Sequence, residues 1–586
     1  MTSNVASRHS GRGEIMKSIL IGAMTFAVAI TMTTVMSCAV PPRSNEQPSP
    51  TTSAVKGKDE KDETASLSTF DAKITVDAEQ KLGQVNRLLF GSYVIAPGGG
   101  NGLLLADGSD FDSEALALVK ELSPTILRLG VLPVFEDALG ERHSRREARC
   151  GWERWHTHDY GLDEHMLLLE KIGAPGQALI TLGYPYGLVD SSDPQSCITR
   201  KANLSQMAKR AAAWVAYANG DPDDQTVIGV DDDGFDWRTV GYWAKRRGKN
   251  GHPVPYGIKF WLVGSEVFYD DIPVQQYAAD YLVFYDEMKR VDPQIAVVAS
   301  ARLEPWKQEE WNAPLLSAIG SKVDGLELHM YYPLVDEGHD LDKVVMASAT
   351  QADKDLVSVR ELVARYTDRA EEIELILGEN GLLYSGDYEY VRTWNTLLAG
   401  LYDVDLIGTF VQRSANYRLA LAVQHFLHAD SGDADIMFDW DTRERYRRPD
   451  YYALQMWTRH FGDTLLQTTV RCETFDIPAT HGNVGPLEDI PYLAVHASMS
   501  NDSQLYLLVI NRSLTKDVEA IISISGFMPR TTGKVYTLDG PDIHATNEDD
   551  NHDAISIRES AISNVAKEFV FTLAAHSVTV LELEKE

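Results

Sequence analysis

Two glutamates that end similar apolar segments are the residues of this sequence best suited to chemistry. Residues 257–266 read Gly-Ile-Lys-Phe-Trp-Leu-Val-Gly-Ser-Glu, and residues 373–381 read Ile-Glu-Leu-Ile-Leu-Gly-Glu-Asn-Gly. A short apolar run bounded by turn residues is typical of a buried parallel strand, so Glu266 and Glu379 each end a strand. Paired carboxylates at the carboxyl ends of barrel strands indicate glycoside hydrolysis, with one as general acid and the other as nucleophile or base. Capping of a following helix, or pairing with an arginine, is the structural alternative for each.

The segments that must position these glutamates alternate between strand-like and helical patterns. The predicted strands are 88–95, 124–129, 178–182, 258–263, 295–299, 323–328, 373–377 and 404–410. The predicted helices are 163–172, 204–218, 274–290, 356–366 and one that begins at 415. Alternating strands and helices predict a parallel sheet, and eight such strands predict a closed (β/α)8 TIM barrel over residues 88–464. Glu266 then follows the fourth strand and Glu379 the seventh.

A second, all-β region follows the barrel. Helical patterns give way after about residue 465 to short alternating or apolar runs separated by turn residues, at 505–511, 518–524, 534–538, 569–573 and 578–583. This pattern predicts a C-terminal β-sandwich over residues 465–586, which makes the fold class α/β with an appended all-β domain. The segment 69–87 carries a further strand, Ile74 to Val76, which we expect to join the sandwich.

The N-terminus has the pattern of an export signal. Met16 and Lys17 precede an apolar run that ends at Met36 and is followed by Ser37 and Cys38. This order resembles a bacterial lipoprotein signal, in which the cysteine is lipidated, and an uncleaved membrane anchor is the alternative. We therefore expect a signal over residues 1–38, including an upstream extension of 15 residues. The Pro- and Ser-rich segment 39–68 would then be a flexible tether. The expected location is the bacterial cell envelope, lipid-anchored and facing the periplasm or the cell surface.

Composition narrows the possible partners. The net charge of −32 and pI of about 4.9 argue against nucleic acid, whose phosphates this charge would repel, but not against neutral sugars. The four cysteines, Cys38, Cys150, Cys197 and Cys472, match no metal motif, although Cys150 and Cys197 could pair in an oxidising compartment. The acidic run 231–234 lacks the downstream glutamate of an EF-hand and predicts a solvated turn. We expect neither a metal nor a cofactor.

Several further segments carry a family resemblance. They are 161–165 (Gly-Leu-Asp-Glu-His), 214–220 (Trp-Val-Ala-Tyr-Ala-Asn-Gly), 251–266, 292–295, 328–332 (Leu-His-Met-Tyr-Tyr), 378–381 (Gly-Glu-Asn-Gly), 508–513 and 575–581. In order and spacing they resemble the α-L-arabinofuranosidases of glycoside hydrolase family 51. The resemblance runs from about Ile74 to Leu583.

The resemblance implies a retaining mechanism with Glu266 as acid/base and Glu379 as nucleophile. It also implies that Arg128 lies at the base of the sugar pocket, and that His329 and Tyr331 flank the nucleophile, with Tyr331 hydrogen-bonding it. The residues it implies for substrate binding are Arg128, Ser265, His329, Tyr331 and Gln424.

The sequence departs from the family around the sugar pocket. Ser265 stands where the family has an asparagine that holds a sugar hydroxyl. The family's acidic residue after the first strand has no counterpart in 93–95, and 130–133 reads Gly-Val-Leu-Pro in place of Pro-Gly-Gly-Asn. Because the glutamate pair is intact, we expect the reaction to be glycoside hydrolysis, as in the family. The identity of the sugar does not follow from the sequence.

The leading hypothesis is an exported, lipid-anchored retaining glycosidase that releases α-L-arabinofuranosyl residues from plant-type polysaccharides by double displacement. The alternatives are another retaining glycosidase of xylosidase, glucanase or glucuronidase type, a catalytically silent carbohydrate-binding lipoprotein, and a structural envelope protein. The expected partners are an oligo- or polysaccharide and, through the lipid only, a membrane. The oligomeric state stays open.

Overall fold

The computed structural model describes residues 71–94, 102–105, 109–132, 134–150, 154–156, 158–184, 203–334, 341–383, 395–428, 445–548 and 551–586. All of them belong to one compact unit, Phe70–Glu586. The predicted signal and tether, Cys38 included, lie outside the described residues. No helix in the described ranges is both long and apolar enough to cross a membrane.

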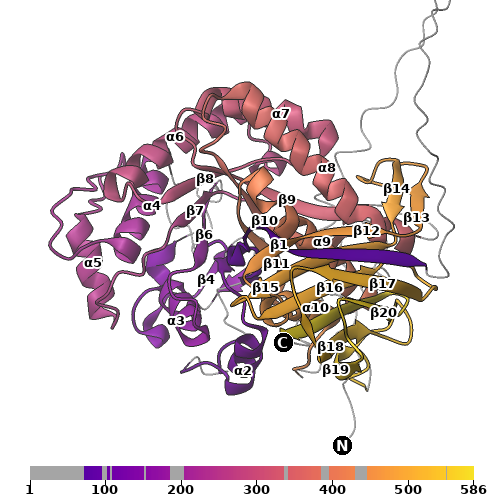
Figure 1. Cartoon of the computed structure of the whole chain (residues 1–586). Helices are drawn as coiled ribbons and strands as arrows, with labels where there is room; N and C mark the ends of the chain where they lie inside the picture. Colours follow the sequence, from indigo (N-terminus) through magenta and orange to yellow (C-terminus); the bar gives the residue numbers. More distant parts are fainter. Residues whose placement is uncertain are drawn as a thin grey trace, which may run out of the picture. The chain divides into compact units, whose positions relative to one another are not determined.

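Eight parallel strands close into a barrel (Figure 1), which confirms the predicted fold class. Around the barrel each strand pairs with the next one along the chain, and the last pairs with the first. The strands are β2 (Gly91–Val94), β3 (Leu127–Leu129), β6 (Ala178–Leu182), β7 (Phe260–Val263), β8 (Ala296–Ser300), β9 (Gly325–Pro333), β10 (Glu374–Leu383) and β11 (Leu419–His428). β7 is therefore the fourth barrel strand and β10 the seventh. Apolar side chains on both faces are buried, which is why these strands are apolar runs in the sequence.

Helices follow most of these strands and cover the barrel. They are α2 (Ser113–Leu122), α3 (Leu162–Ile172), α4 (Leu204–Asn219), α5 (Val240–Lys249), α6 (Val274–Val291), α7 (Pro305–Ile319), α8 (Asp342–Tyr366), α9 (Leu397–Tyr417) and α10 (Pro449–Arg459). Local sequence sets several of their starts: Asp112 accepts hydrogen bonds from two amides of the first turn of α2, and Asn203 accepts one at α4.

The predicted eighth strand was wrong. Residues 404–410 lie inside α9, and the eighth strand is β11, where we had predicted a helix from 415. The first twelve residues of α9, 397–408, are all buried, so this part of the helix shows no exposed polar face and no helical period. A short apolar run of this kind cannot be assigned to strand or helix by periodicity.

A nine-stranded sheet forms the C-terminal part, with β1 (Ala72–Gln84) among its inner strands. β1 runs antiparallel to β12 (Thr464–Arg471) and parallel to β17 (Val518–Ser525), so the sheet is mixed. Its other strands are β15 (Leu493–Ser500), β16 (Gln504–Asn511), β18 (Pro529–Asp539), β19 (Ser556–Ser563), β20 (Glu568–Leu573) and β21 (Ser577–Lys585). Two short pairs lie apart, β4 (Ala148–Cys150) with β5 (Arg154–His156) and β13 (Thr474–Ile477) with β14 (Leu487–Pro491).

α9 joins the barrel to this sheet. Asp405 on α9 accepts two hydrogen bonds from the Arg512 guanidinium, at 2.6 and 2.7 Å, in a buried bidentate pair. Gly408 leaves room for the ring of His496 on β15, because a Cβ at 408 would lie 2.4 Å from His496 Nε2. One hydrophobic cluster includes barrel residues together with Leu508, Ile510 and Val578 of the sheet. The sheet therefore completes the cover of the barrel rather than standing apart from it.

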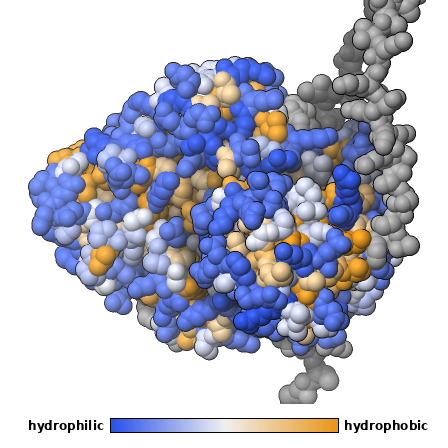
Figure 2. Space-filling view, in the orientation of Figure 1, coloured by the Kyte–Doolittle hydropathy of each residue, from blue (hydrophilic) through white to orange (hydrophobic). Residues whose placement is uncertain are grey.

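The visible surface is mostly hydrophilic, with apolar side chains scattered among charged ones (Figure 2). Exposed apolar residues dispersed in this way are ordinary for a folded protein. The acidic run at 231–234 forms a turn, as predicted, but only residues 232–234 are solvated and Asp231 is buried. Asp231 Oδ1 accepts hydrogen bonds from the amides of Asp233 and Phe235, and Oδ2 accepts one from the indole of Trp237.

Candidate active site

The two glutamates meet at one end of the barrel, Glu266 after β7 and Glu379 inside β10 rather than at its end as predicted. Glu266 lies three residues beyond β7 in the left-handed region, at φ 52°, and Glu379 lies within β10 beside an irregularity in its pairing with β9. One carboxylate oxygen of each lies within 4.8 Å of the other. Retaining glycosidases hold their carboxyl groups about 5–5.5 Å apart and inverting enzymes about 6.5–9.5 Å apart. The two oxygens are thus closer than the inverting range, and the short approach favours the retaining geometry.

The turn that presents Glu266 depends on Gly264. Its φ is +74°, and a Cβ there would lie 2.5 Å from a Val267 methyl group and 2.8 Å from the carbonyl oxygen of Tyr184. A glycine accepts both the left-handed backbone and the close approach. The Glu266 side chain ends 39% exposed, whereas that of Glu379 is 13% exposed. Of the two, Glu266 is thus the one more open to solvent and to a leaving group.

Arg128, on β3, is completely buried beneath this pair. Its Nη1 lies 3.2 Å from Glu379 Oε1 and donates to the carbonyl of Gly378 at 2.9 Å, while Nη2 donates to Ser265 Oγ at 2.8 Å. The guanidinium also stacks on the Tyr93 ring, 4.4 Å from its centroid. Burial alone would lower the pKa of Arg128, but Tyr93, Glu379 and Glu327 together raise it, so the group stays a cation. A buried cation against Glu379 stabilises the ionised carboxylate.

His329 lies between the two glutamates. Its Nδ1 is 2.8 Å from Glu266 Oε1 and 3.4 Å from Glu379 Oε2, and its Nε2 contacts Glu327. Burial alone would lower the pKa of His329, but the carboxylates of Glu327, Glu379 and Glu266 raise it well above its usual value. These carboxylates favour the protonated ring, which can donate through both nitrogens.

Tyr331 donates a hydrogen bond of 2.6 Å to Glu379 Oε2, the contact that the family resemblance implies. Burial and the Glu379 charge raise the pKa of this phenol, so it remains a donor. Asn483 donates to the Tyr331 carbonyl at 2.7 Å, which ties the end of β9 to the chain beyond β13.

Ser265 is more than a turn residue, because its hydroxyl accepts the 2.8 Å hydrogen bond from Arg128. Gln424 on β11 pairs in register with Asn380 and Ser92 and is 4% exposed. Neither polar atom of the Gln424 side chain has a hydrogen-bond partner within the described part of the chain. The structure therefore joins Arg128, Ser265, Glu266, His329, Tyr331 and Glu379 in one network and leaves Gln424 outside it, with its amide unpaired.

Glu327 is the residue of this network that the sequence analysis missed. It lies two residues before His329 and four before Tyr331 on β9. Alternate residues of a strand face the same side, so this spacing of two was a signal that could have found it.

The cysteine hypotheses lie mostly beyond the described residues. Cys38 and Cys197 are outside them, so lipidation and the pairing of Cys150 with Cys197 stay predictions. Cys472 is a partly buried free thiol.

The polar atoms of Glu266, His329 and Glu379 are close enough together to be considered as metal ligands. The donor set does not fit a cation, because both His329 nitrogens already contact carboxylates and the Arg128 cation already lies against the other oxygen of Glu379.

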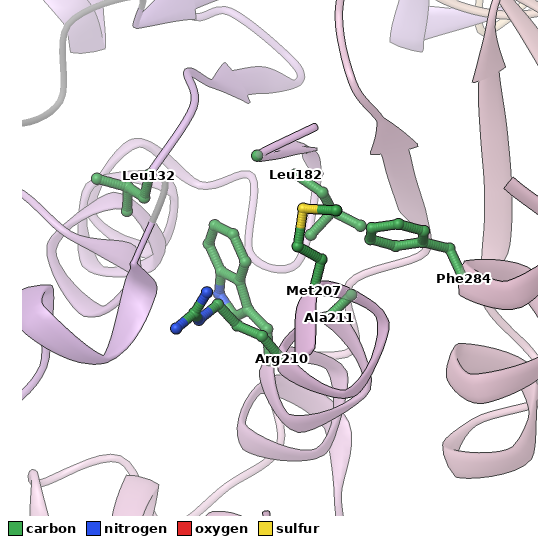
Figure 3. Close-up of a pocket in the computed structure, with 8 residues that line it drawn as sticks. Leu132, Leu182, Met207, Arg210, Ala211 and Phe284 are labelled. Carbon is green, nitrogen blue, oxygen red and sulfur yellow. The ribbon is translucent and has the colours of Figure 1, made fainter. Parts of the chain in front are cut away.

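A small pocket apart from the glutamates, shown in Figure 3, lies where α4 meets the ends of β3 and β6. It is lined by Leu132, Leu182, Gly183, Met207, Arg210, Ala211, Trp214 and Phe284, and none of these belongs to the glutamate network.

A (β/α)8 barrel that holds two glutamates at this separation is the architecture of a glycoside hydrolase. Family models for the "Alpha-L-arabinofuranosidase 1 domain" and the "Alpha-L-arabinofuranosidase C-terminal domain" match residues 119–343 and 406–577. The chain belongs to the α-L-arabinofuranosidases of glycoside hydrolase family 51, as its motifs predicted.

Individual relatives are distant. The intracellular exo-α-(1→5)-L-arabinofuranosidase 1 of Bacillus subtilis is 23% identical over 519 residues, which span 81% of this chain and 92% of that protein. The thermostable family 51 α-L-arabinofuranosidase of Thermotoga petrophila matches with a TM-score of 0.72 at 23% identity, and the Thermotoga maritima enzyme, solved with arabinose, matches with 0.71 at 23%. Each of these two alignments covers 88% of this chain and 100% of the other, and shows a shared fold.

Proposed function

We propose that this protein is a retaining glycosidase that removes α-L-arabinofuranosyl residues from plant-type polysaccharides. The observation that carries the proposal is the separation of the two carboxylates, within 4.8 Å, with the cation of Arg128 and the phenol of Tyr331 both directed at Glu379. These two contacts suit an ionised nucleophile. The more exposed Glu266 suits a group that exchanges protons with a leaving group and then with water.

In the first step Glu379 attacks the anomeric carbon, and the bond to the leaving oxygen breaks while Glu266 gives that oxygen its proton. A covalent glycosyl-enzyme results. In the second step Glu266, now ionised, takes a proton from a water molecule whose oxygen attacks the same carbon and releases Glu379. His329, at 2.8 Å from Glu266 and 3.4 Å from Glu379, is placed to stabilise whichever carboxylate is ionised.

The printed names of the relatives support the sugar: one acts on α-(1→5)-linked arabinofuranose and another was solved with arabinose. The net charge of −32 also suits a neutral glycan better than an anionic one. The test is hydrolysis of a panel of nitrophenyl glycosides by the chain from residue 69. Cleavage of α-L-arabinofuranoside ahead of xyloside, glucoside and glucuronide would support the proposal.

Other outcomes of the panel separate the alternatives. Faster cleavage of another glycoside would indicate a xylosidase, glucanase or glucuronidase. Sugar binding without hydrolysis would indicate a silent binding lipoprotein, and absence of any sugar binding would indicate a structural envelope protein.

Ser265→Asn is expected to raise kcat/KM on an arabinofuranoside by up to about tenfold, the worth of one hydrogen bond of roughly 1.4 kcal/mol. An asparagine carbonyl can still accept from Arg128 Nη2 while its NH2 is offered to a sugar hydroxyl, whereas serine offers the sugar only a single, shorter hydroxyl. Contacts to the hydroxyl beside the anomeric carbon strengthen in the transition state, so kcat should change more than KM. A neutral or harmful Ser265→Asn would show that the pocket is built around serine.

Export and lipid anchoring are proposed from the sequence alone. Cys38→Ser is expected to release the protein from the membrane fraction with its activity unchanged, because a segment of disordered composition separates Cys38 from β1. The measurement is fractionation of cells followed by a glycosidase assay of each fraction. A variant that stays in the membrane fraction would instead support a spanning anchor.

A further inference from the structure

We propose that Glu327 is a positioning residue that holds His329 and Arg128 in the orientations from which they serve Glu266 and Glu379. The inference rests on the proposed function, since it concerns the same reaction. It adds a third carboxylate, one whose side chain is almost completely buried behind the other two.

The contacts of Glu327 converge on one oxygen. Its side chain is 1% exposed, and its Oε1 lies 3.2 Å from Arg128 Nη1 and in contact with His329 Nε2. Each of these partners also contacts a catalytic candidate: Arg128 Nη1 itself lies 3.2 Å from Glu379 Oε1, and the other ring nitrogen of His329, Nδ1, lies 2.8 Å from Glu266 Oε1. Glu327 therefore acts on Glu266 through His329 and on Glu379 through Arg128.

The absence of a side chain at Gly378 leaves room in the barrel interior for the Glu327 carboxylate. A Cβ added to Gly378, directly before Glu379, would lie 2.2 Å from Glu327 Oε1, 2.7 Å from its Cγ and 2.8 Å from its Cδ. Any residue other than glycine at 378 would thus displace the Glu327 side chain. The Gly378 carbonyl also accepts a hydrogen bond from Arg128 Nη1, so the same glycine seats both members of the pair.

The charges explain why a carboxylate is needed there. Glu327 accepts from His329 Nε2, which orients the ring so that Nδ1 faces Glu266. A neutral amide in its place could still accept a hydrogen bond, but it would no longer supply the charge that favours the imidazolium or offsets the Arg128 cation. The amide would also present an NH2 group to two donors in one of its two orientations. Loss of the charge should therefore loosen the hydrogen bond between His329 and Glu266.

The test compares Glu327→Gln with the wild-type protein on two glycosides of the same sugar, one with a poor alcohol leaving group and one with a dinitrophenyl group. We expect kcat/KM to fall about tenfold to a hundredfold on the alcohol, part of the roughly 10²–10⁴ that general acid catalysis supplies. The loss should be several-fold smaller on the dinitrophenyl glycoside, which departs without a proton. In a Glu266→Gln background the same substitution should cost several-fold less than in the wild type, because the arm through His329 is then already lost and groups that act through one another are non-additive. The loss that remains reports the arm through Arg128 and Glu379.

Asp163→Asn is the matched control, because Asp163 is a buried carboxylate on α3 that accepts hydrogen bonds from Tyr217 and Tyr256 away from the glutamates. Asp163→Asn should change kcat/KM by the same factor on the two glycosides. Should Glu327→Gln fail to fold, Glu327→Asp, which keeps the charge but shortens the reach, is expected to give the same selective loss.

An equal loss on both substrates, full additivity with Glu266→Gln, or failure of both variants to fold would overturn the proposal. A wild type that cleaves no glycoside would instead contradict the proposed function itself. If the wild type is active and Glu327→Gln has the same kcat/KM, only the proposed role of Glu327 is contradicted.

Discussion

Glu379→Gln is expected to lower kcat by at least about 10²–10⁴ on every glycoside that the wild type cleaves. The amide has nearly the same shape as the carboxylate and can still accept a hydrogen bond from Tyr331, but it is a very weak nucleophile. The loss should be independent of the leaving group, because no covalent intermediate can form however readily the leaving group departs. Steady-state kinetics on a nitrophenyl and an alkyl glycoside measure both effects.

Glu374→Gln is the matched control for this variant. Glu374 begins the same strand, β10, at the opposite end of the barrel, where it lies 3.5 Å from Lys259. The kcat of Glu374→Gln should equal that of the wild type. Mass spectrometry after reaction with a fluorinated, slowly released glycoside should show an adduct on the wild type and none on Glu379→Gln. Near-normal turnover by Glu379→Gln would show that the nucleophile has been assigned wrongly.

Glu266→Gln is expected to lower kcat by about 10²–10⁴ on substrates with poor leaving groups, the usual worth of a general acid–base group. The physical reason differs from that at Glu379: the leaving oxygen must take up a proton as the bond breaks, and the amide has none to give. A dinitrophenyl leaving group needs no proton, so kcat/KM on that substrate should fall much less. This dependence on the leaving group separates the role of Glu266 from that of Glu379.

The control for Glu266→Gln is Glu310→Gln, which removes the same charge from an exposed pair with Lys307 on α7. It should behave as wild type on both substrates. If Glu266→Gln lowers kcat/KM by the same factor for the two leaving groups, then Glu266 supports the site in some other way, and the acid/base assignment is wrong.

The sequence predicted the residues of the site better than it predicted their contacts. Glu266 and Glu379 end local apolar runs bounded by glycine, and such a run predicts a buried strand whatever lies elsewhere in the chain. Arg128 was expected beneath the sugar. Its hydrogen bond to Ser265 joins two residues 137 positions apart, and no local pattern could indicate it.

The eighth strand shows where local pattern misleads. α9 lies between the barrel and the C-terminal sheet, so most of its surface is buried and its helical period is erased. Its apolar stretch at 404–410 then looks like a strand. The helix predicted from 415 is in fact the end of α9 followed by the strand β11.

The sequence alone determined that this chain is an α/β barrel followed by a β-rich domain, that two glutamates belong to its fourth and seventh strand segments, and that its motifs belong to family 51. The structure places Glu379 inside the seventh strand, β10, rather than at its end. Hydrophobic period, turn residues and short motifs are local properties, so they can be recognised before folding is known. Only the tertiary structure decided which carboxylates meet and which cation lies beneath them. It also revealed the third carboxylate, Glu327, against Gly378, because these contacts depend on strand register and barrel closure, which bring residues far apart in the chain within a few ångströms.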